Sequence, residues 1–277
     1  MMTYLRRKIA YVALLAFAGL AAAPLDSPSA DAADEPAPAP ATAAKTADDA
    51  KPAATKSAGA KPNDPKAAGE TKRGTEPKNV GGEPDGVVQV ANVVYAGFKS
   101  SKCFSDHFLV DAEKDAVIST SRRFHAVKLA SDEVYGFPLI IMTGEGAFQL
   151  PDAERKNLRQ FIERGGFLLA SAGCSSEEWD RSFRREMALV FPDRSLAALG
   201  MEHPVFHTVH DINQLEAKHG TPKPLEGISF NGRLGVIYSQ DGLNDTANTQ
   251  GCCCCGGNEI YGAAKVNVNI LVYAVTH

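Results

Sequence analysis

Hydrophobic residues in the last two thirds of the chain form short continuous runs separated by amphipathic segments. The β-branched run at 87–95 is too continuous for a half-exposed strand and predicts a buried central strand. Similar runs predict more strands, and apolar residues at helical spacing between them predict helices. The predicted strands are 87–95, 124–129, 137–143, 167–171, 228–230 and 234–239, and the predicted helices are 105–116, one starting at Pro151, one starting at Ser175, and 266–275.

Local signals set the bounds of two of these helices. Pro151 suits the first turn of its helix, and Gly165-Gly166 ends it. Ser175 with Glu178 is a capping-box pattern that starts the next helix. The large apolar residues of that helix recur at i, i+4 spacing and are predicted to lie in the core; they are Trp179, Phe183 and Met187.

Alternation of strands and helices predicts an α/β fold, namely a doubly wound, mostly parallel, flavodoxin-like sheet with helices on both faces. In such folds ligands bind beyond the carboxyl ends of the strands. Cys103, the loop 144–146, Cys174 and the run 252–255 each follow a predicted strand. We therefore expect these segments to meet at one edge of the sheet.

The first part of the chain has a different composition. Residues 1–32 read as a signal peptide, with three basic residues ahead of an apolar run and a small-residue cleavage site near Ala32. Residues 33–85 are rich in Ala, Pro and Lys, have no aromatic residue, and are predicted to be a disordered linker. The folded domain is then 86–277, and the protein is expected to be periplasmic or secreted.

Net charge narrows the class of partner. The chain carries −4, and removing the three cations and two anions of residues 1–32 leaves −5. The sequence has no basic stripe with interleaved aromatic residues, so nucleic acid is not an expected partner. No membrane span is expected after signal cleavage. A protein partner is one open expectation.

The most unusual feature is a run of four adjacent cysteines, Cys252-Cys253-Cys254-Cys255. Side chains of consecutive residues in an extended chain point to opposite faces, so four neighbouring thiols have no ordinary packing use. We expect a metal site, with zinc as the first metal and Cu(I) or an iron–sulfur cluster as alternatives. The candidate ligands are Cys103, Cys174, Cys252, Cys253, Cys254, Cys255 and His107.

Two other uses of the six cysteines stay open. Export makes structural disulfides chemically feasible, and the even number of cysteines fits them. A redox-active thiol set is the other use. Cys174 also follows a strand and precedes a helix, where the helix dipole favours a thiolate, so it is a candidate catalytic nucleophile.

Charged and imidazole side chains add weaker candidates. Glu145 lies between two glycines and is either a pocket carboxylate that contacts a ligand or a solvated loop residue. His203, His207 and His210 have a spacing compatible with metal binding if a helix begins at Pro204, although a turn at His203 and surface positions for the other two explain them better.

Several short motifs together resemble a known family. They are Phe137-Pro138-Leu139, Met142-Thr143-Gly144, Gly165-Gly166-Phe167-Leu168, Ser182-Phe183-Arg184, His203-Pro204-Val205-Phe206, Leu225-Glu226-Gly227-Ile228, Val236-Ile237-Tyr238-Ser239 and Asn269-Ile270-Leu271-Val272-Tyr273-Ala274. The set resembles the domain of unknown function family 4159 (DUF4159). The resemblance implies a class I glutamine-amidotransferase-like fold related to ThuA-like proteins, and it implies no established activity.

These observations lead to one functional expectation and one alternative. We expect an exported α/β domain that binds or scaffolds through a cysteine-rich metal site at the carboxyl edge of the sheet. The alternative is a thiol-dependent hydrolase or oxidoreductase that uses Cys174. Whether the protein is an enzyme stays open at the level of the sequence.

Overall fold

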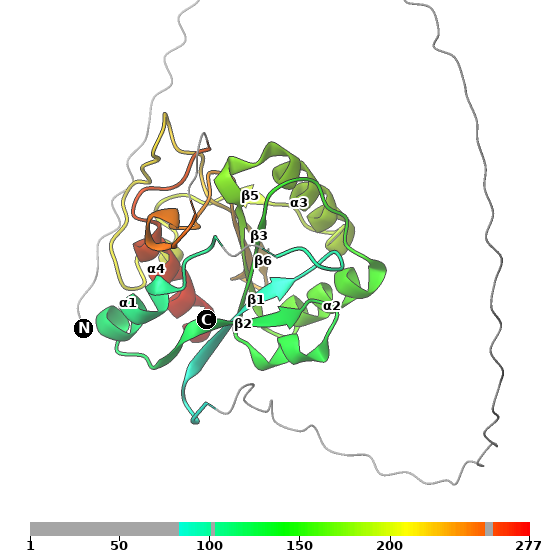
Figure 1. Cartoon of the computed structure of the whole chain (residues 1–277), viewed down its shortest axis with the longest axis horizontal. Helices are drawn as coiled ribbons and strands as arrows, with labels where there is room; N and C mark the ends of the chain where they lie inside the picture. The colour runs from blue at the N-terminus through cyan, green and yellow to red at the C-terminus, as the bar shows by residue number, and fades with distance from the viewer. Residues whose placement is uncertain (1–82, 101–102, 253–256) are drawn as a thin grey trace, which may run out of the picture. The chain divides into compact units, whose positions relative to one another are not determined.

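The computed structural model describes residues 83–100, 103–252 and 257–277 (Figure 1). The predicted signal peptide at 1–32 and nearly all of the predicted linker at 33–85 lie outside these residues. Cys253, Cys254 and Cys255 also lie outside them. No helix in the described part of the chain is both long and apolar enough to cross a bilayer.

The described residues form one seven-stranded sheet with four α-helices. The strands are β1 (Val88–Val94), β2 (Thr120–Lys128), β3 (Leu139–Gly144), β4 (Phe167–Ala172), β5 (Ala197–Ala198), β6 (Glu226–Phe230) and β7 (Arg233–Ser239). The helices are α1 (His107–Ala116), α2 (Asp152–Glu163), α3 (Glu177–Val190) and α4 (Ala263–Thr276), with short 3₁₀ turns at η1 (Asp132–Gly136), η2 (Gly173–Ser175), η3 (Pro204–Phe206) and η4 (Thr246–Asn248).

The sheet order is β2-β1-β3-β4-β7-β6-β5. The first five strands in that order pair in parallel, whereas β6 and β5 continue the sheet in antiparallel fashion. The prediction of an α/β, mostly parallel sheet is confirmed. Strand β5 was not predicted, because two exposed alanines carry no hydrophobic pattern.

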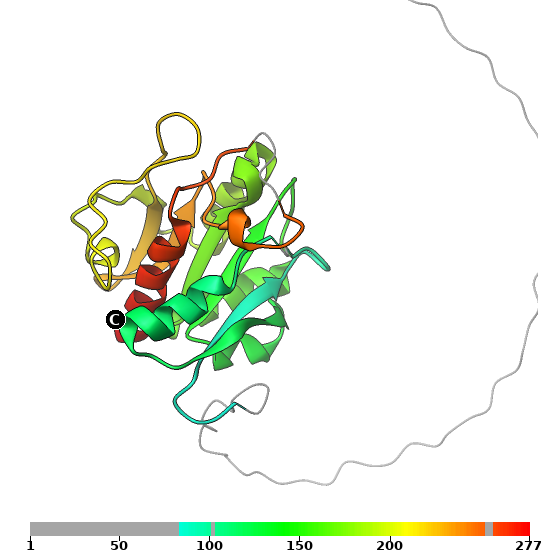
Figure 2. The ribbon, with the colours of Figure 1, turned by 60° about the vertical axis from the view of Figure 1, so that its left-hand side comes forward.

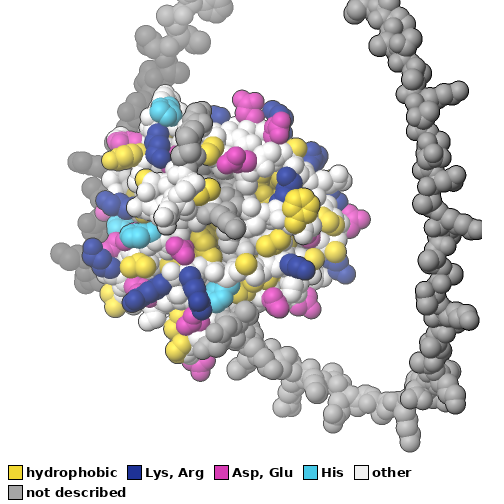
Figure 3. All heavy atoms as spheres, in the orientation of Figure 1, with side chains coloured by type: hydrophobic (Ala, Val, Ile, Leu, Met, Phe, Trp, Pro, Cys, Tyr) yellow, Lys and Arg dark blue, Asp and Glu magenta, His cyan; other side chains and the backbone are white. Residues whose placement is uncertain are grey.

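Helices cover both faces of the sheet, α2 and α3 on one and α1 and α4 on the other (Figures 1 and 2). Side-chain alternation in β1 divides the core accordingly. Ala91 and Val93 belong to the core beneath α2 and α3, while Val90 belongs to the core beneath α1 and α4. Burial on both faces explains why the parallel strands read as continuous hydrophobic runs. The outer surface has mixed charge, since acidic and basic side chains are interspersed over the face seen in Figure 3.

Two helix starts differ from the prediction. Ser176, and not Ser175, is the N-cap of α3, and its Oγ accepts a hydrogen bond from the Trp179 N–H at 3.3 Å. Ser175 has a left-handed backbone with φ of 53°, and its hydroxyl instead bonds to the backbone of Asn258. Pro151 likewise precedes α2 as its N-cap and does not lie in the first turn.

The parallel strands follow the 2-1-3-4-5 order of flavodoxin-like sheets when β7 is counted as the fifth. The chain leaves β1 through α1 on one face and leaves β3 through α2 on the other. The connections therefore diverge between the carboxyl ends of β1 and β3. Such a divergence is where open α/β sheets hold their ligands.

Candidate functional site

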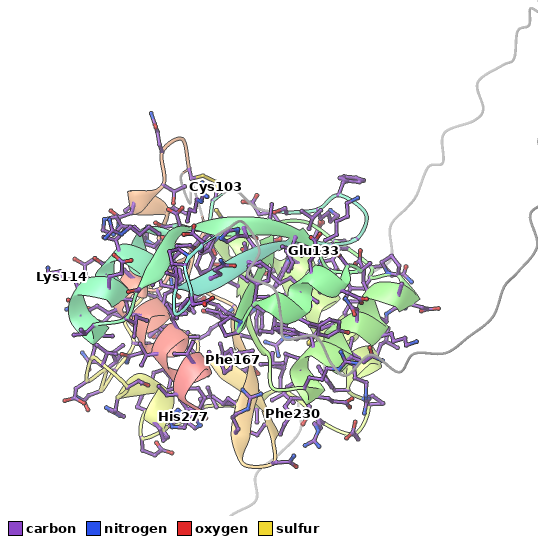
Figure 4. All side chains as sticks on the ribbon, turned by 90° about the horizontal axis from the view of Figure 1, so that it is seen from below. Cys103, Lys114, Glu133, Phe167, Phe230 and His277 are labelled. Atoms are coloured by element: carbon purple, nitrogen blue, oxygen red, sulfur yellow. A yellow bond between two sulfur atoms is a disulfide. The ribbon has the colours of Figure 1, made fainter. Side chains whose placement is uncertain are left out.

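A disulfide joins Cys103, ahead of α1, to Cys252, beyond η4. It is visible beside the Cys103 label in Figure 4, on the opposite side of that view from the β6–β7 turn at Phe230. The bond thus lies toward the carboxyl edge of the sheet. A structural disulfide was one of the uses of the cysteines that the sequence left open. A sulfur in a disulfide is not a thiolate, so neither cysteine can ligate a metal while this bond is intact.

Cys174 lies in η2, directly after β4, with a left-handed backbone of φ 49° and ψ 36°. The end of the cysteine loop packs against it, because a Cβ added at Gly257 would overlap the carbonyl oxygen of Cys174. Only glycine permits this approach. The structure therefore brings Gly257, the second residue after the cysteine run, to Cys174, while Cys253, Cys254 and Cys255 lie outside the described residues.

Glu145 is exposed on the loop after β3 and lies next to the β4–α3 connection. A Cβ at Gly173 would be 3.1 Å from the Glu145 Cγ and 3.0 Å from the Gly144 carbonyl oxygen. The next residue, Gly146, donates its N–H to the Ser176 hydroxyl at 3.2 Å. The loops that follow β3 and β4 therefore pack on each other, as their common position after parallel strands predicts.

The other predicted ligands are dispersed. His107 is exposed at the start of α1, with its Nδ1 3.3 Å from the Asp111 carboxylate. Across residues 83–100, 103–252 and 257–277, no group of three or more His, Cys, Asp and Glu side chains is placed to hold a metal ion. The three histidines near η3 have separate contacts, His203 with the Val205 N–H, His207 with Asp211 and His210 with Asp115.

A buried polar network that the sequence did not reveal supports the carboxyl edge. Asn244 Oδ1 accepts a hydrogen bond from the Ser171 hydroxyl at 2.6 Å, and Asn244 Nδ2 donates to the Thr143 hydroxyl at 3.2 Å. The Leu243 N–H donates to the same Ser171 hydroxyl at 2.7 Å. Because β3, β4 and the segment after β7 share these bonds, the chain leading to η4 and Cys252 is held in a defined position.

The loop after β1 is fixed from two sides. The Tyr95 hydroxyl donates to the Thr143 carbonyl oxygen at 3.1 Å and accepts from Trp179 Nε1 at 2.7 Å, and burial raises the pKa of Tyr95 to about 12. The Ala96 N–H donates to the Glu154 carboxylate of α2 at 2.8 Å. Tyr95 and Lys99 then pair across the tight turn, which gives this loop a rigid shape.

A groove of about 650 Å³ opens beside this loop, at the carboxyl ends of β1 and β2. One wall comes from the chain between β1 and α1, and the other comes from η4 and the two residues after it. The Cys103–Cys252 disulfide joins these two walls. The lining residues are Asn92, Val94, Phe98, Ser100, Phe104, Ser105, Asp106, Phe124, Ala126, Asn248, Thr249 and Gln250.

Glu154 is expected to make the stability of the domain depend on pH. Burial raises its pKa above the ordinary value of 4.5, although hydrogen bonds from the N–H groups of Ala96 and Gly97 oppose the shift. A carboxyl with a raised folded-state pKa favours folding below its unfolded pKa, and this contribution is lost as the pH rises through the folded pKa. We therefore expect Glu154→Gln to gain stability relative to the wild type as the pH rises from below 4.5 to neutrality.

Urea unfolding of both proteins across this pH range tests the expectation. All other carboxyl groups are common to the two proteins, so their effects cancel in the difference. A stability difference that stays flat or falls with rising pH would contradict the assigned role of Glu154.

Comparison with known proteins identifies the family of the chain. A family model described as domain of unknown function (DUF4159) matches residues 107–275, which run from the start of α1 nearly to the end of α4. No curated protein matches the chain.

Proposed function

Because the chain belongs to the DUF4159 family, whose description assigns no activity, we propose a function from the site itself: an exported domain that binds a small ligand in the groove beside β1 and β2. The observation that carries this proposal is the cross-linking of the two groove walls by the Cys103–Cys252 disulfide. A disulfide there reduces the conformational freedom of both walls, so the groove loses less conformational entropy when a ligand binds.

The chemistry of the groove favours binding over catalysis. Asp106 is the one ionisable residue in the described part of the lining, whereas general acid–base catalysis usually employs titratable groups matched to both proton transfers. The volume lies within the range of roughly 300–1,000 Å³ that small-molecule sites occupy.

The disulfide also supports the proposal of export. Disulfides persist in oxidising compartments and are rare where thiol reductants are abundant. This agrees with the signal peptide expected at 1–32.

Ligand screening of the full chain tests the proposed groove. Proton–nitrogen NMR spectra are recorded with a library of neutral sugars, nucleosides, amino acids and quaternary amines. A bound compound is expected to shift the amides of Ser105 and Thr249, and Ala126→Trp is expected to abolish binding, since Ala126 is an exposed lining residue on the edge strand β2. Lys128→Trp, on the same strand but outside the lining, is the matched control.

A second candidate function is favoured by the contact between Cys174 and Gly257. Gly257 is two residues beyond the cysteine run in the sequence, and on this ground we propose that Cys174 with Cys253, Cys254 and Cys255 would suit zinc, with Cu(I) or an iron–sulfur cluster as alternatives. Without a metal, the same thiol at the start of α3 would suit the hydrolase or oxidoreductase alternative.

Alkylation kinetics separate these uses of Cys174. If Cys174 ligates a metal, it is expected to resist alkylation until a chelator is added, and Cys174→Ser is expected to lose metal in elemental analysis. Rapid alkylation of metal-loaded protein would contradict ligation and favour a nucleophilic thiol. Slow alkylation with and without chelator would contradict both uses.

A further inference from the structure

We propose that the groove ligand is a neutral carbohydrate, an inference that rests on the proposed binding function and specifies its ligand class. The groove combines three phenylalanine rings with six uncharged polar side chains and one carboxylate. A sugar ring presents an apolar C–H face and a rim of hydroxyl groups, so it matches this combination. The supporting observations concern charge, the exposed Phe98, and the buried hydroxyl of Thr249.

The charge of the lining disfavours anionic ligands. Among the lining residues that the structure describes there is no Lys, Arg or His, and Asp106 contributes the one formal charge. A phosphate or carboxylate ligand would meet no cationic partner among these described residues and would be repelled by Asp106. The uncharged polar side chains suit hydroxyl groups, which both donate and accept hydrogen bonds; they are Asn92, Ser100, Ser105, Asn248, Thr249 and Gln250.

Phe98 is displayed to solvent by a rigid loop. Its exposed fraction is 85%, although it lies only four residues beyond the end of a buried strand. The turn that carries it is closed by the pairing of Tyr95 with Lys99 and anchored by the bond from the Ala96 N–H to Glu154. Because the backbone that carries it is held, this phenyl ring offers a flat apolar surface to a ligand at a smaller loss of conformational freedom than a ring on an open loop would.

The remaining aromatic rings form the apolar part of the groove. The ring centroids of Phe104 and Phe124 are 6.0 Å apart, and the rings are tilted by 60°. Phe104 is buried, so this pair is part of the core as well as of the lining. The exposed Phe98 is therefore the ring whose removal affects a ligand without opening a cavity in the core.

Thr249 provides a polar group that a ligand could satisfy. Its Oγ1 is buried and has no hydrogen-bond partner among the described residues, although the residue lines the groove. A buried hydroxyl without a partner costs free energy, and rotation of the Thr249 side chain toward a ligand hydroxyl in the groove would recover it. Asp106, exposed on the same lining, is a strong acceptor for a second ligand hydroxyl.

Calorimetric titration of the oxidised full chain with maltose, cellobiose and N,N′-diacetylchitobiose tests the inference. At least one neutral disaccharide is expected to bind. Phe98→Ala is expected to weaken that binding at least about tenfold, as loss of an aromatic anchor does. Thr249→Val is expected to weaken it by about three- to tenfold without lowering the melting temperature, because the variant removes an unsatisfied hydroxyl. Tyr261→Ala, which removes an exposed aromatic ring outside this groove, should leave affinity unchanged.

Parallel titrations with choline and glucose 6-phosphate distinguish failure of the ligand class from failure of the groove. Binding of choline or glucose 6-phosphate in place of every neutral sugar, if lost in Ala126→Trp, would overturn the carbohydrate assignment and leave the proposed binding function standing. Sugar binding unaffected by both Phe98→Ala and Ala126→Trp would overturn the assignment of the groove. If neither the NMR library nor these probes bind, both proposals fail.

Discussion

Replacing Trp179 by alanine is expected to lower the free energy of unfolding by about 3–5 kcal/mol. Trp179 has no exposed surface, and its ring stacks on Phe183 with centroids 5.1 Å apart. Truncation would leave a cavity beneath α3 and remove the indole N–H that donates to the Tyr95 hydroxyl. The loss of that bond should also loosen the loop that carries Phe98.

Denaturant unfolding of the full chain measures this effect. Trp179→Phe is a necessary second variant, because it retains most of the apolar volume and removes the indole N–H; we expect it to cost about 1–3 kcal/mol. Leu189→Ala lies on the same helix with 55% of its surface exposed and should change stability by less than about 0.5 kcal/mol. A Trp179→Ala effect no larger than that of Leu189→Ala would contradict the assigned packing.

Reducing the Cys103–Cys252 disulfide is expected to lower the free energy of unfolding by about 2–4 kcal/mol. The two cysteines are separated by 149 residues, so the bond closes a long loop that includes most of the domain. A cross-link of this kind acts mainly by restricting the unfolded chain. Reduction should also release the two groove walls and weaken ligand binding.

Urea unfolding with and without reductant measures the contribution of this bond. The double variant Cys103→Ser/Cys252→Ser should have the stability of the reduced wild type and should not respond further to reductant. Both residues are replaced together so that neither is left to pair with another cysteine of the run. An oxidised wild type no more stable than the double variant would contradict a stabilising role.

Periodicity was sufficient to predict the fold class. The spacing of Trp179, Phe183 and Met187 predicted one buried helix face, and all three residues lie in the core. The hydrophobic run at 87–95 predicted a central strand, and β1 has a neighbour on each side. These predictions rest on local sequence, because burial on both faces of a sheet requires a hydrophobic run wherever it occurs along the chain.

Pairwise contacts between distant residues were not predictable in the same way. Ser175 and Ser176 are chemically identical as caps, and the choice between them depends on Asn258, which is 83 residues from Ser175. By its sequence, Glu154 is one more polar residue on an amphipathic helix. In the structure its carboxylate accepts a hydrogen bond from the N–H of Ala96, which is 58 residues away in the sequence. No local sequence pattern predicts hydrogen-bond partners that are this distant in the sequence.

The cysteines show most clearly the difference between what local sequence predicts and what contacts between distant residues determine. The sequence by itself determined that Cys103, Cys174 and the cysteine run all follow strands, and parallel strands end at a common edge. Tertiary structure alone decided that Cys103 pairs with Cys252 and that Gly257 packs on Cys174. The physical reason is that four adjacent cysteines have nearly identical local chemistry, so the paths of the surrounding loops, set by bonds such as those of Asn244, determine which sulfur reaches a partner.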